Sequence, residues 1–157
     1  GPRIKPKVRL LYTGGHADNP EFFELLQQND AHVVSDNTGF GTRAADVLIC
    51  EDGDPLEAII NYYFEEKPAA TRQMGTQVER MERLLDLVKQ YKADGVVASR
   101  LYMCDLWAFE HFLMRKRLHE NNVPFLELEV DYTPEGQGQI KTRVQAFVES
   151  LADRQTA

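Results

Sequence analysis

The stretch that decides the fold is Asp94-Gly-Val-Val-Ala-Ser-Arg-Leu-Tyr-Met-Cys-Asp105, in which a short apolar run leads into a loop that carries a cysteine. Residues 96–98 are typical of a buried parallel strand, and Asp105 opens a segment with apolar residues at helical spacing. The stretch therefore predicts a strand, a turn and a helix, with Cys104 beside the helix N-terminus. Ligands of open parallel sheets collect at the carboxyl ends of the strands, and a helix N-terminus favours the thiolate form that metals bind. We expect any chemistry of the protein to be located here.

The composition indicates one globular domain. The chain has 157 residues, of which 43% are hydrophobic, and this is enough for a substantial core. Its formal charge of −7 disfavours a nucleic-acid partner. No apolar run approaches the roughly 18 residues of a membrane span and no signal-peptide core is present, so we expect a cytoplasmic protein with no membrane partner. Cys50 and Cys104 are the two cysteines, too few for a disulfide framework.

The first residues predict that the domain was cut from a longer protein. Gly1-Pro2 is typical of the scar of a cleaved tag and takes no part in fold reasoning. Residues 5–7 lead straight into a strand with no preceding element. We therefore expect residues 1–157 to be a single α/β domain of a longer subunit, with catalytic partners outside it.

Apolar runs and the turns between them predict a three-layer α/β fold of the Rossmann-like or flavodoxin-like type. Four parallel strands are expected near residues 8–12, 31–35, 95–99 and 124–130, in the order 2-1-3-4, with helices on both faces. The switch point of this order falls between the first and third strands, so a crevice should open beside the Gly14-Gly15 turn. A small edge strand is expected at Val47–Cys50.

Caps and apolar stripes predict the helices. Asn19 and Pro20 are typical of a helix start. A second helix is expected from Pro55 and a longer one over residues 75–92, and Met74 is expected in the core. The side chains predicted to be buried on these two helices are Leu56, Ile59, Ile60 and Tyr63, and then Val78, Met81, Leu84, Leu85, Val88 and Tyr91. The last helix is expected to bury Ile140, Val144, Phe147, Val148 and Leu151.

Two segments have the features of an anion-binding site. The loop Asp36–Arg43 could place backbone N–H groups and Arg43 against a phosphate or carboxylate, although it lacks a dinucleotide fingerprint and is equally typical of a surface loop. Lys141, Thr142 and Arg143 occupy the first turns of the last helix, where the helix dipole favours anions over cations. A bound phosphate and an ordinary salt bridge of Arg143 would both explain these cations.

Several motifs together resemble the 2-hydroxyacyl-CoA dehydratase and benzoyl-CoA reductase family. They are Ala93-Asp-Gly-Val-Val97, Cys104-Asp105, Val123-Pro-Phe-Leu-Glu-Leu-Glu-Val-Asp131 and Gly138-Gln-Ile-Lys-Thr-Arg-Val-Gln-Ala-Phe-Val-Glu149. Ser35-Asp-Asn-Thr-Gly-Phe-Gly-Thr-Arg43 resembles the family's glycine-containing loop, and Asp54-Pro-Leu-Glu57 the helix start that follows it. The likeness covers most of the chain, and its most specific part is Thr142-Arg-Val-Gln-Ala-Phe147.

The resemblance implies that the chain is the C-terminal domain of one subunit of a heterodimer. Subunits of this family have two α/β domains with a [4Fe-4S] cluster between them, and Cys104 matches the cysteine that the second domain contributes. An ATP-dependent iron–sulfur activator supplies one low-potential electron, which passes to an acyl-CoA thioester; dehydratases then remove water, whereas reductases dearomatise a benzoyl ring. Members are therefore lyases or oxidoreductases of anaerobic metabolism. The residues that we expect to bind the substrate are Gly14, Gly15, Arg43, Gln139, Thr142 and Arg143.

Two alternatives stay open at this point. The domain could be a non-catalytic module that binds CoA phosphates and a sister subunit, or a flavodoxin-like regulator with an acidic site at Asp36 and Asp131. Because a cubane cluster needs about four ligands, Cys104 alone cannot hold it. We expect the isolated domain to contain no cluster and to be inactive, and only the intact parent enzyme to carry [4Fe-4S].

Overall fold

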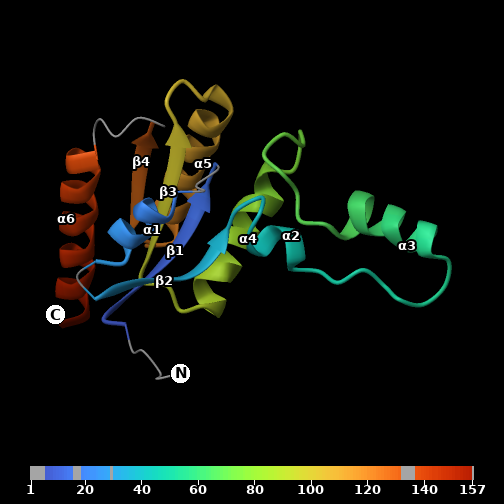
Figure 1. Cartoon of the computed structure of the whole chain (residues 1–157), viewed down its shortest axis with the longest axis horizontal. Coiled ribbons are helices and arrows are strands. Elements are labelled where there is room, and N and C mark those ends of the chain that lie inside the picture. The colour runs from blue at the N-terminus through green and yellow to red at the C-terminus, as the bar shows by residue number, and fades with distance from the viewer. Residues whose placement is uncertain (1–5, 16–18, 29, 132–136, 157) are drawn as a thin grey trace.

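The computed structural model describes residues 6–15, 19–28, 30–131 and 137–156 (Figure 1). Its elements along the chain are β1 (Val8–Gly14), α1 (Pro20–Leu26), β2 (Ala31–Asn37), α2 (Thr42–Ala45), α3 (Pro55–Asn61), the π-helix η1 (Tyr62–Glu66), α4 (Gln77–Gln90), β3 (Gly95–Leu101), α5 (Asp105–Glu120), β4 (Phe125–Val130) and α6 (Gln137–Thr156). No helix in this described part is long and apolar enough to cross a membrane.

The four strands form one parallel sheet in the order β2-β1-β3-β4, which confirms the predicted fold class and strand order. The register aligns Leu10 with Gly95 and Val96 with Phe125. β1 and β3 are central, and both of their faces are covered, which is why Leu10–Tyr12 and Val96–Ala98 are apolar at successive positions with no alternation. β2 and β4 are the edges of the sheet.

Two helical layers cover the sheet (Figure 1). α1 and α6 pack on one face against Leu10 and Tyr12, whereas α4 and α5 pack on the other face against Leu11 and Val96. The chain therefore leaves β1 toward the α1 face and leaves β3 toward the α5 face. This divergence places the switch point between β1 and β3, as predicted, and the carboxyl ends of these two strands flank it.

The helix starts and the last helix also match the prediction. Asn19 caps α1, because its Oδ1 accepts a hydrogen bond of 2.9 Å from the backbone N–H of Glu21. α6 buries Val144, Val148 and Leu151, and Ile140 and Phe147 pack beside them. Since α6 begins at Gln137, Thr142 and Arg143 lie in its second turn.

The segment between α2 and α4 differs from the prediction. Residues 48–50 have no regular structure, so the expected edge strand at Val47–Cys50 is wrong. α3 forms where expected, but its apolar stripe is exposed and not buried: the exposed side chains are Leu56, Ile59, Ile60 and, in η1, Tyr63. Helical spacing indicates that such a face needs a partner, yet it cannot indicate that this chain supplies one.

Two further residues predicted to be in the core lie at the surface. Met74 is 93% exposed and Val78 is 71% exposed, whereas Met81 is buried as expected. Val78 lies in the first turn of α4, the end of the helix that follows α3 and η1. The inner turns of α4 carry the core residues, and its first turn does not reach the sheet.

Candidate functional site

The Gly14-Gly15 turn, where the crevice is predicted, lies where β1, β3 and α5 meet. Gly14 ends β1 with φ of +137°, and a Cβ atom there would lie 2.2 Å from the carbonyl oxygen of Ser99, so no larger residue fits. The backbone N–H of Gly15 donates to the same oxygen at 3.0 Å. A Cβ on Gly15 would lie 3.4 Å from Nε1 of Trp107 in α5. The two glycines thus bring the end of β1 against the start of α5.

Cys104 is the N-cap residue of α5, at the carboxyl end of β3. Its backbone carbonyl accepts from the N–H of Ala108 at 3.0 Å, and its side chain makes no capping hydrogen bond. The free N–H groups of the first turn therefore remain available to an anionic ligand or to sulfur. Met103 precedes it in the left-handed region, with φ of +61°, a conformation that a side chain of this size rarely adopts. The turn thus holds Cys104 at the positive end of the helix, half-buried, as the sequence predicts.

Apolar side chains surround Cys104 and are uncovered. Tyr102 and Met103 are 63% and 77% exposed, and Leu106 and Phe109 on α5 are exposed as well. Covering such a surface would remove water from around the thiol. Cys50 does not contribute, because it lies exposed in the segment before α3, with Sγ 3.7 Å from the carbonyl oxygen of Asp52. Within the described residues, no group of three or more His, Cys, Asp or Glu side chains could hold a metal ion.

Arg43 lies in a separate polar cluster beneath the ends of β1 and β2. It shares a cavity of about 10 Å³ with Arg80, Arg83 and Glu110, which is room for one water molecule and not for a phosphate. Burial, together with the positive charges of Arg80 and Arg83, lowers the pKa of Arg43. The structure therefore does not bring Arg43 to the groove of Arg143 described next, and its role in substrate binding stays a prediction.

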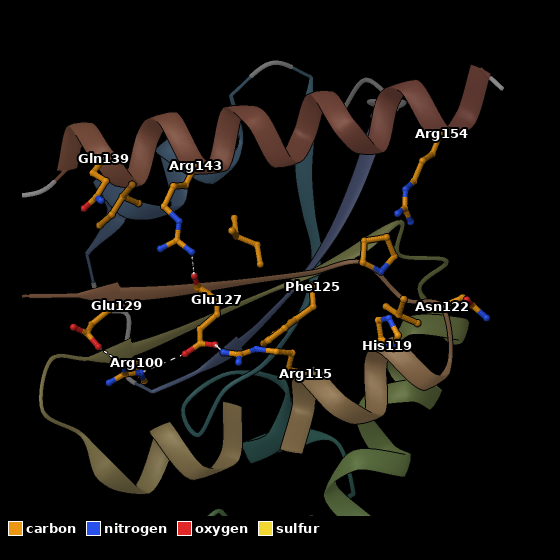
Figure 2. Close-up of a pocket in the computed structure, with 14 residues that line it drawn as sticks. Arg100, Arg115, His119, Asn122, Phe125, Glu127, Glu129, Gln139, Arg143 and Arg154 are labelled. Atoms are coloured by element: carbon orange, nitrogen blue, oxygen red, sulfur yellow. Dashed lines mark hydrogen bonds and ion pairs between the residues drawn. The ribbon is translucent and has the colours of Figure 1, made fainter. Parts of the chain in front are cut away.

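A groove of about 870 Å³ lies over the edge strand β4, between α5 and α6 (Figure 2). Gln139 and Arg143, two of the residues predicted to bind the substrate, project into it from α6. Thr142 does not line it, because its hydroxyl donates to the carbonyl of Gly138 in its own helix at 3.0 Å. The remaining charged residues of the lining are Arg100, Arg115, His119, Glu127, Glu129 and Arg154.

The groove carries excess positive charge. Arg100 pairs with Glu129, and Arg115 pairs with Glu127, so each carboxylate is already matched by a guanidinium. Burial alone would raise the pKa of Glu127, but the hydrogen bond from Arg115 and the positive charge of Arg115 outweigh it and hold the pKa below its usual value. Glu127 therefore stays ionised and neutralises the positive charge of Arg115.

Two arginines of α6 retain free donors toward the groove. Arg143 uses Nη2 to donate to the backbone carbonyl of Glu127 at 2.7 Å, which leaves its other guanidinium N–H groups unused. Arg154 makes no hydrogen bond or ion pair within the part of the chain that the structure describes. The same contact of Arg143 covers the outer edge of β4, since the backbone carbonyl of Glu127 points away from β3. Another strand therefore cannot add at this position without displacing Arg143.

The sequence argument missed Arg100, Arg115 and Arg154 as groove residues. A signal existed for Arg154, because it follows Arg143 by 11 residues, about three helical turns, so both side chains project from the same face of α6. The basic run from Arg115 to His119 is also what the dipole of a helix C-terminus favours, so it does not by itself indicate a groove. Arg100 lies on a strand whose tertiary neighbours cannot be read from the sequence.

Comparison with known proteins identifies the family. The family model described as 2-hydroxyglutaryl-CoA dehydratase, D-component, matches residues 1–151. A protein of Escherichia coli (strain K12) with the provisional name dehydratase subunit YjiM is 29% identical over 96% of this chain and 39% of its own length. The (R)-phenyllactyl-CoA dehydratase beta subunit of Clostridium sporogenes is 26% identical over 94% of this chain and 40% of its own length.

The (R)-2-hydroxyglutaryl-CoA dehydratase, subunit beta, of Acidaminococcus fermentans is 25% identical over 91% of the chain and 38% of its own length. The chain thus spans about two fifths of the length of the curated relatives that it matches. Because the family model covers nearly all of its residues, this chain belongs to the 2-hydroxyacyl-CoA dehydratase family, the family of the 2-hydroxyglutaryl-CoA dehydratase D-component.

Proposed function

We propose that this chain is part of one subunit of a 2-hydroxyacyl-CoA dehydratase, in which it supplies the Cys104 thiolate to a [4Fe-4S] cluster and binds the phosphate end of acyl-CoA. The observation that carries the proposal is the position of Cys104, at a helix N-terminus without a side-chain cap and at the carboxyl end of β3, one of the two strands that flank the switch point. The relatives named as dehydratase subunits favour removal of water over ring reduction.

The donor set around Cys104 fits one share of a cluster and not a whole one. One thiolate is present, and the free N–H groups of the first turn of α5 can donate to sulfur, which stabilises a reduced and more negative cluster. The uncovered apolar residues beside it would keep water away once another surface packs on them. The remaining thiolates must come from residues beyond this crevice. When bound, a [4Fe-4S] cluster takes up and passes on one electron at a time.

The groove fits the nucleotide end of a CoA thioester. This end of CoA carries a diphosphate and a 3′-phosphate, and the groove offers arginines on three of its walls within about 870 Å³. Arg143 and Arg154 have donors left for phosphate oxygens, and guanidinium forks match such oxygens in pairs. In this proposal the groove fixes the nucleotide, and the acyl group extends toward the sheet's carboxyl ends. An ATP-dependent activator and a second subunit complete the enzyme.

The test of the cluster assignment is Cys104→Ser in the intact protein with its second subunit. We expect the anaerobically purified variant to lose iron and visible absorbance, because serine is a poor ligand for these clusters. Cys50→Ser is the matched control and should keep the wild-type iron content. A Cys104→Ser protein with full iron content would remove Cys104 from the ligand set.

The groove is tested separately, by titration with CoA. Arg143→Ala should weaken binding by about 1 to 3 kcal/mol, the typical loss of a charge-assisted hydrogen bond. Lys141→Ala, on the same helix but outside the groove lining, should leave the affinity unchanged. An unchanged affinity of Arg143→Ala would mean that Arg143 serves only the carbonyl of Glu127.

A further inference from the structure

Glu127, in the middle of the groove over β4, contacts an arginine from each of three other elements. Its carboxylate pairs with Arg115 of α5, and its Oε1 lies 3.6 Å from Nε of Arg100 on β3. Its backbone carbonyl accepts a hydrogen bond of 2.7 Å from Nη2 of Arg143 on α6. Figure 2 shows the three guanidinium groups arranged around this one residue. Cations from both helices and from the sheet are therefore connected through Glu127.

The alternation of side chains along β4 explains why a carboxylate lies at this point. Leu126 and Leu128 belong to the core on the α6 side of the sheet, so Phe125 and Glu127 face α5. On that side Glu127 lies beside the fully buried ring of His111, whose Nδ1 is 3.4 Å from Oε1. The side chain of Glu127 is only 23% exposed. A carboxylate at this depth needs charged or hydrogen-bonding partners, and the arginines supply them.

A negative side chain in a groove that binds anions is unfavourable unless it has a second role. The carboxylate repels a bound phosphate, and the groove would be more positive without it. This repulsion is offset if the carboxylate fixes the arginines, because a free arginine loses much rotamer freedom when it binds a ligand. Arg115 is the clearest case, since its side chain is 62% exposed and is held by Glu127 through Nη2. Within the described residues, Nε and Nη1 of Arg115 have no other partner.

We propose that Glu127 is a positioning residue of the groove, which holds Arg115 and Arg100 in the orientation that binds a phosphate before the ligand arrives. The identification of that phosphate as part of CoA rests on the proposed function, whereas the contacts of Glu127 do not. Arg115 is fixed by one guanidinium nitrogen and offers the others to phosphate oxygens. Arg100 is held between Glu127 and Glu129. Arg143 is bound to the backbone carbonyl, so a substitution of the Glu127 side chain leaves that contact in place.

The rival explanation is that Glu127 only neutralises part of the positive charge of the groove. Two substitutions separate the explanations. Glu127→Asp keeps the charge but shortens the side chain by one methylene, so it weakens phosphate binding if the carboxylate orients the arginines and has no effect if it only neutralises them. Glu127→Gln keeps the length but removes the charge, so neutralisation predicts tighter binding. Positioning predicts a loss smaller than that of Glu127→Asp, because the amide oxygen still accepts a hydrogen bond from Arg115, without the assistance of charge.

The test is calorimetric titration of the full-length protein, together with its second subunit, with CoA. Glu127→Asp should weaken binding about tenfold, the order of effect expected when a long side chain must be ordered by the ligand. Glu149→Asp, the same change at an exposed position of α6 outside the groove lining, is the control and should keep the wild-type affinity. In an Arg115→Gln background, Glu127→Asp should weaken binding by less than about threefold, because Glu127 acts through the arginine. The free energy of unfolding, measured in urea, separates a purely structural role, which would lower stability and leave the affinity of the folded protein unchanged.

The outcomes separate this inference from the proposed function. CoA binding with wild-type affinity in Glu127→Asp overturns the positioning role and leaves the CoA site intact. Equal losses for Glu127→Asp in the wild-type and Arg115→Gln backgrounds also overturn it, because Glu127 would then not act through Arg115. A protein that does not bind CoA but binds ADP or inorganic pyrophosphate, with the same dependence on Glu127, keeps the positioning role and removes the CoA assignment. A wild-type protein that binds none of the three overturns the inference.

Discussion

At the scale of single residues, the buried ion pair between Arg80 and Glu110 connects segments that are far apart in the sequence. Nε and Nη2 of Arg80 donate to the two carboxylate oxygens of Glu110 at 2.7 and 2.8 Å, and both side chains are less than a tenth exposed. The pair joins α4 to α5. Nη1 of Arg80 also donates to the carbonyls of Ala70 and Gln73, in the loop between η1 and α4. The sequence does not reveal it, because the two residues are 30 positions apart and each is typical of an exposed helix face.

Glu110→Ala should destabilise the protein by about 3 to 5 kcal/mol, because it leaves the Arg80 guanidinium buried without its counter-charge. The measurement is the free energy of unfolding in urea. Glu120→Ala, which removes an exposed partner of Arg117 at 3.5 Å, is the control and should cost less than about 1 kcal/mol. A loss for Glu110→Ala as small as that of the control would mean that water replaces the carboxylate.

At the scale of elements, the four strands were predictable because burial on both faces leaves a simple signature. β1 and β3 each contain a short run of successive apolar residues, and the connections between parallel strands permit few topologies. The N-cap of α1 was equally clear, since Asn19 and Pro20 determine it locally. Elements that are specified by their own residues and by the sheet were thus predicted within a few residues of their bounds.

α3 and α5 show where periodicity stops being informative. The apolar face of α3 is typical of a core helix, yet no residue of the described chain covers it and it lies in solvent. α5 is the opposite case, since it buries Glu110 and His111 and exposes Phe109 and Phe112. A hydrophobic pattern identifies a helix, but it cannot identify a polar pair that tertiary contacts satisfy inside, or an apolar surface that is reserved for a partner.

The candidate site was only partly predictable for the same reason. Cys104, Gly14 and Gly15 lie at the carboxyl ends of adjacent strands, which follows from topology alone. Gln139 and Arg143 share a groove, whereas Arg43 lies elsewhere, because the position of the Asp36–Arg43 loop depends on tertiary contacts. Asp36 ties this loop down by accepting from the backbone N–H and hydroxyl groups of Thr38 and Thr42. The carboxylate is thereby committed to structure, which weakens the alternative of an acidic regulatory site at Asp36.

At the scale of the whole molecule, the buried side chain of His111 should make the free energy of unfolding depend on pH. It is fully buried between Trp107, its neighbour on α5, and Phe125 on β4, with ring centroids 6.0 and 6.3 Å away. The charged groups near it are Glu127 on β4, whose Oε1 is 3.4 Å from Nδ1, Arg100 on β3 and Glu110 on its own helix. Neither ring nitrogen has a hydrogen bond in the described part of the chain. Burial lowers the pKa of His111 below its ordinary value of 6.5, and the nearby Glu127 does not overcome this effect.

The sign of the resulting pH dependence follows from the two states. Near pH 6.5 the unfolded chain begins to take up a proton at position 111, whereas the folded chain does so only at lower pH, so the free energy of unfolding falls as pH decreases from about 6.5 to the folded pKa and then levels off. We expect His111→Phe, which keeps a ring in the layer, to flatten this part of the profile in urea titrations between roughly pH 4.5 and 8. His119→Gln, at an exposed position of the same helix, should keep the wild-type slope. A His111→Phe profile parallel to that of the wild type would show that the pKa of His111 does not change on folding. A wild-type free energy of unfolding that instead rises as pH decreases through this range, with no such rise in His111→Phe, would show that pairing with Glu127 and not burial determines the charge of the imidazole.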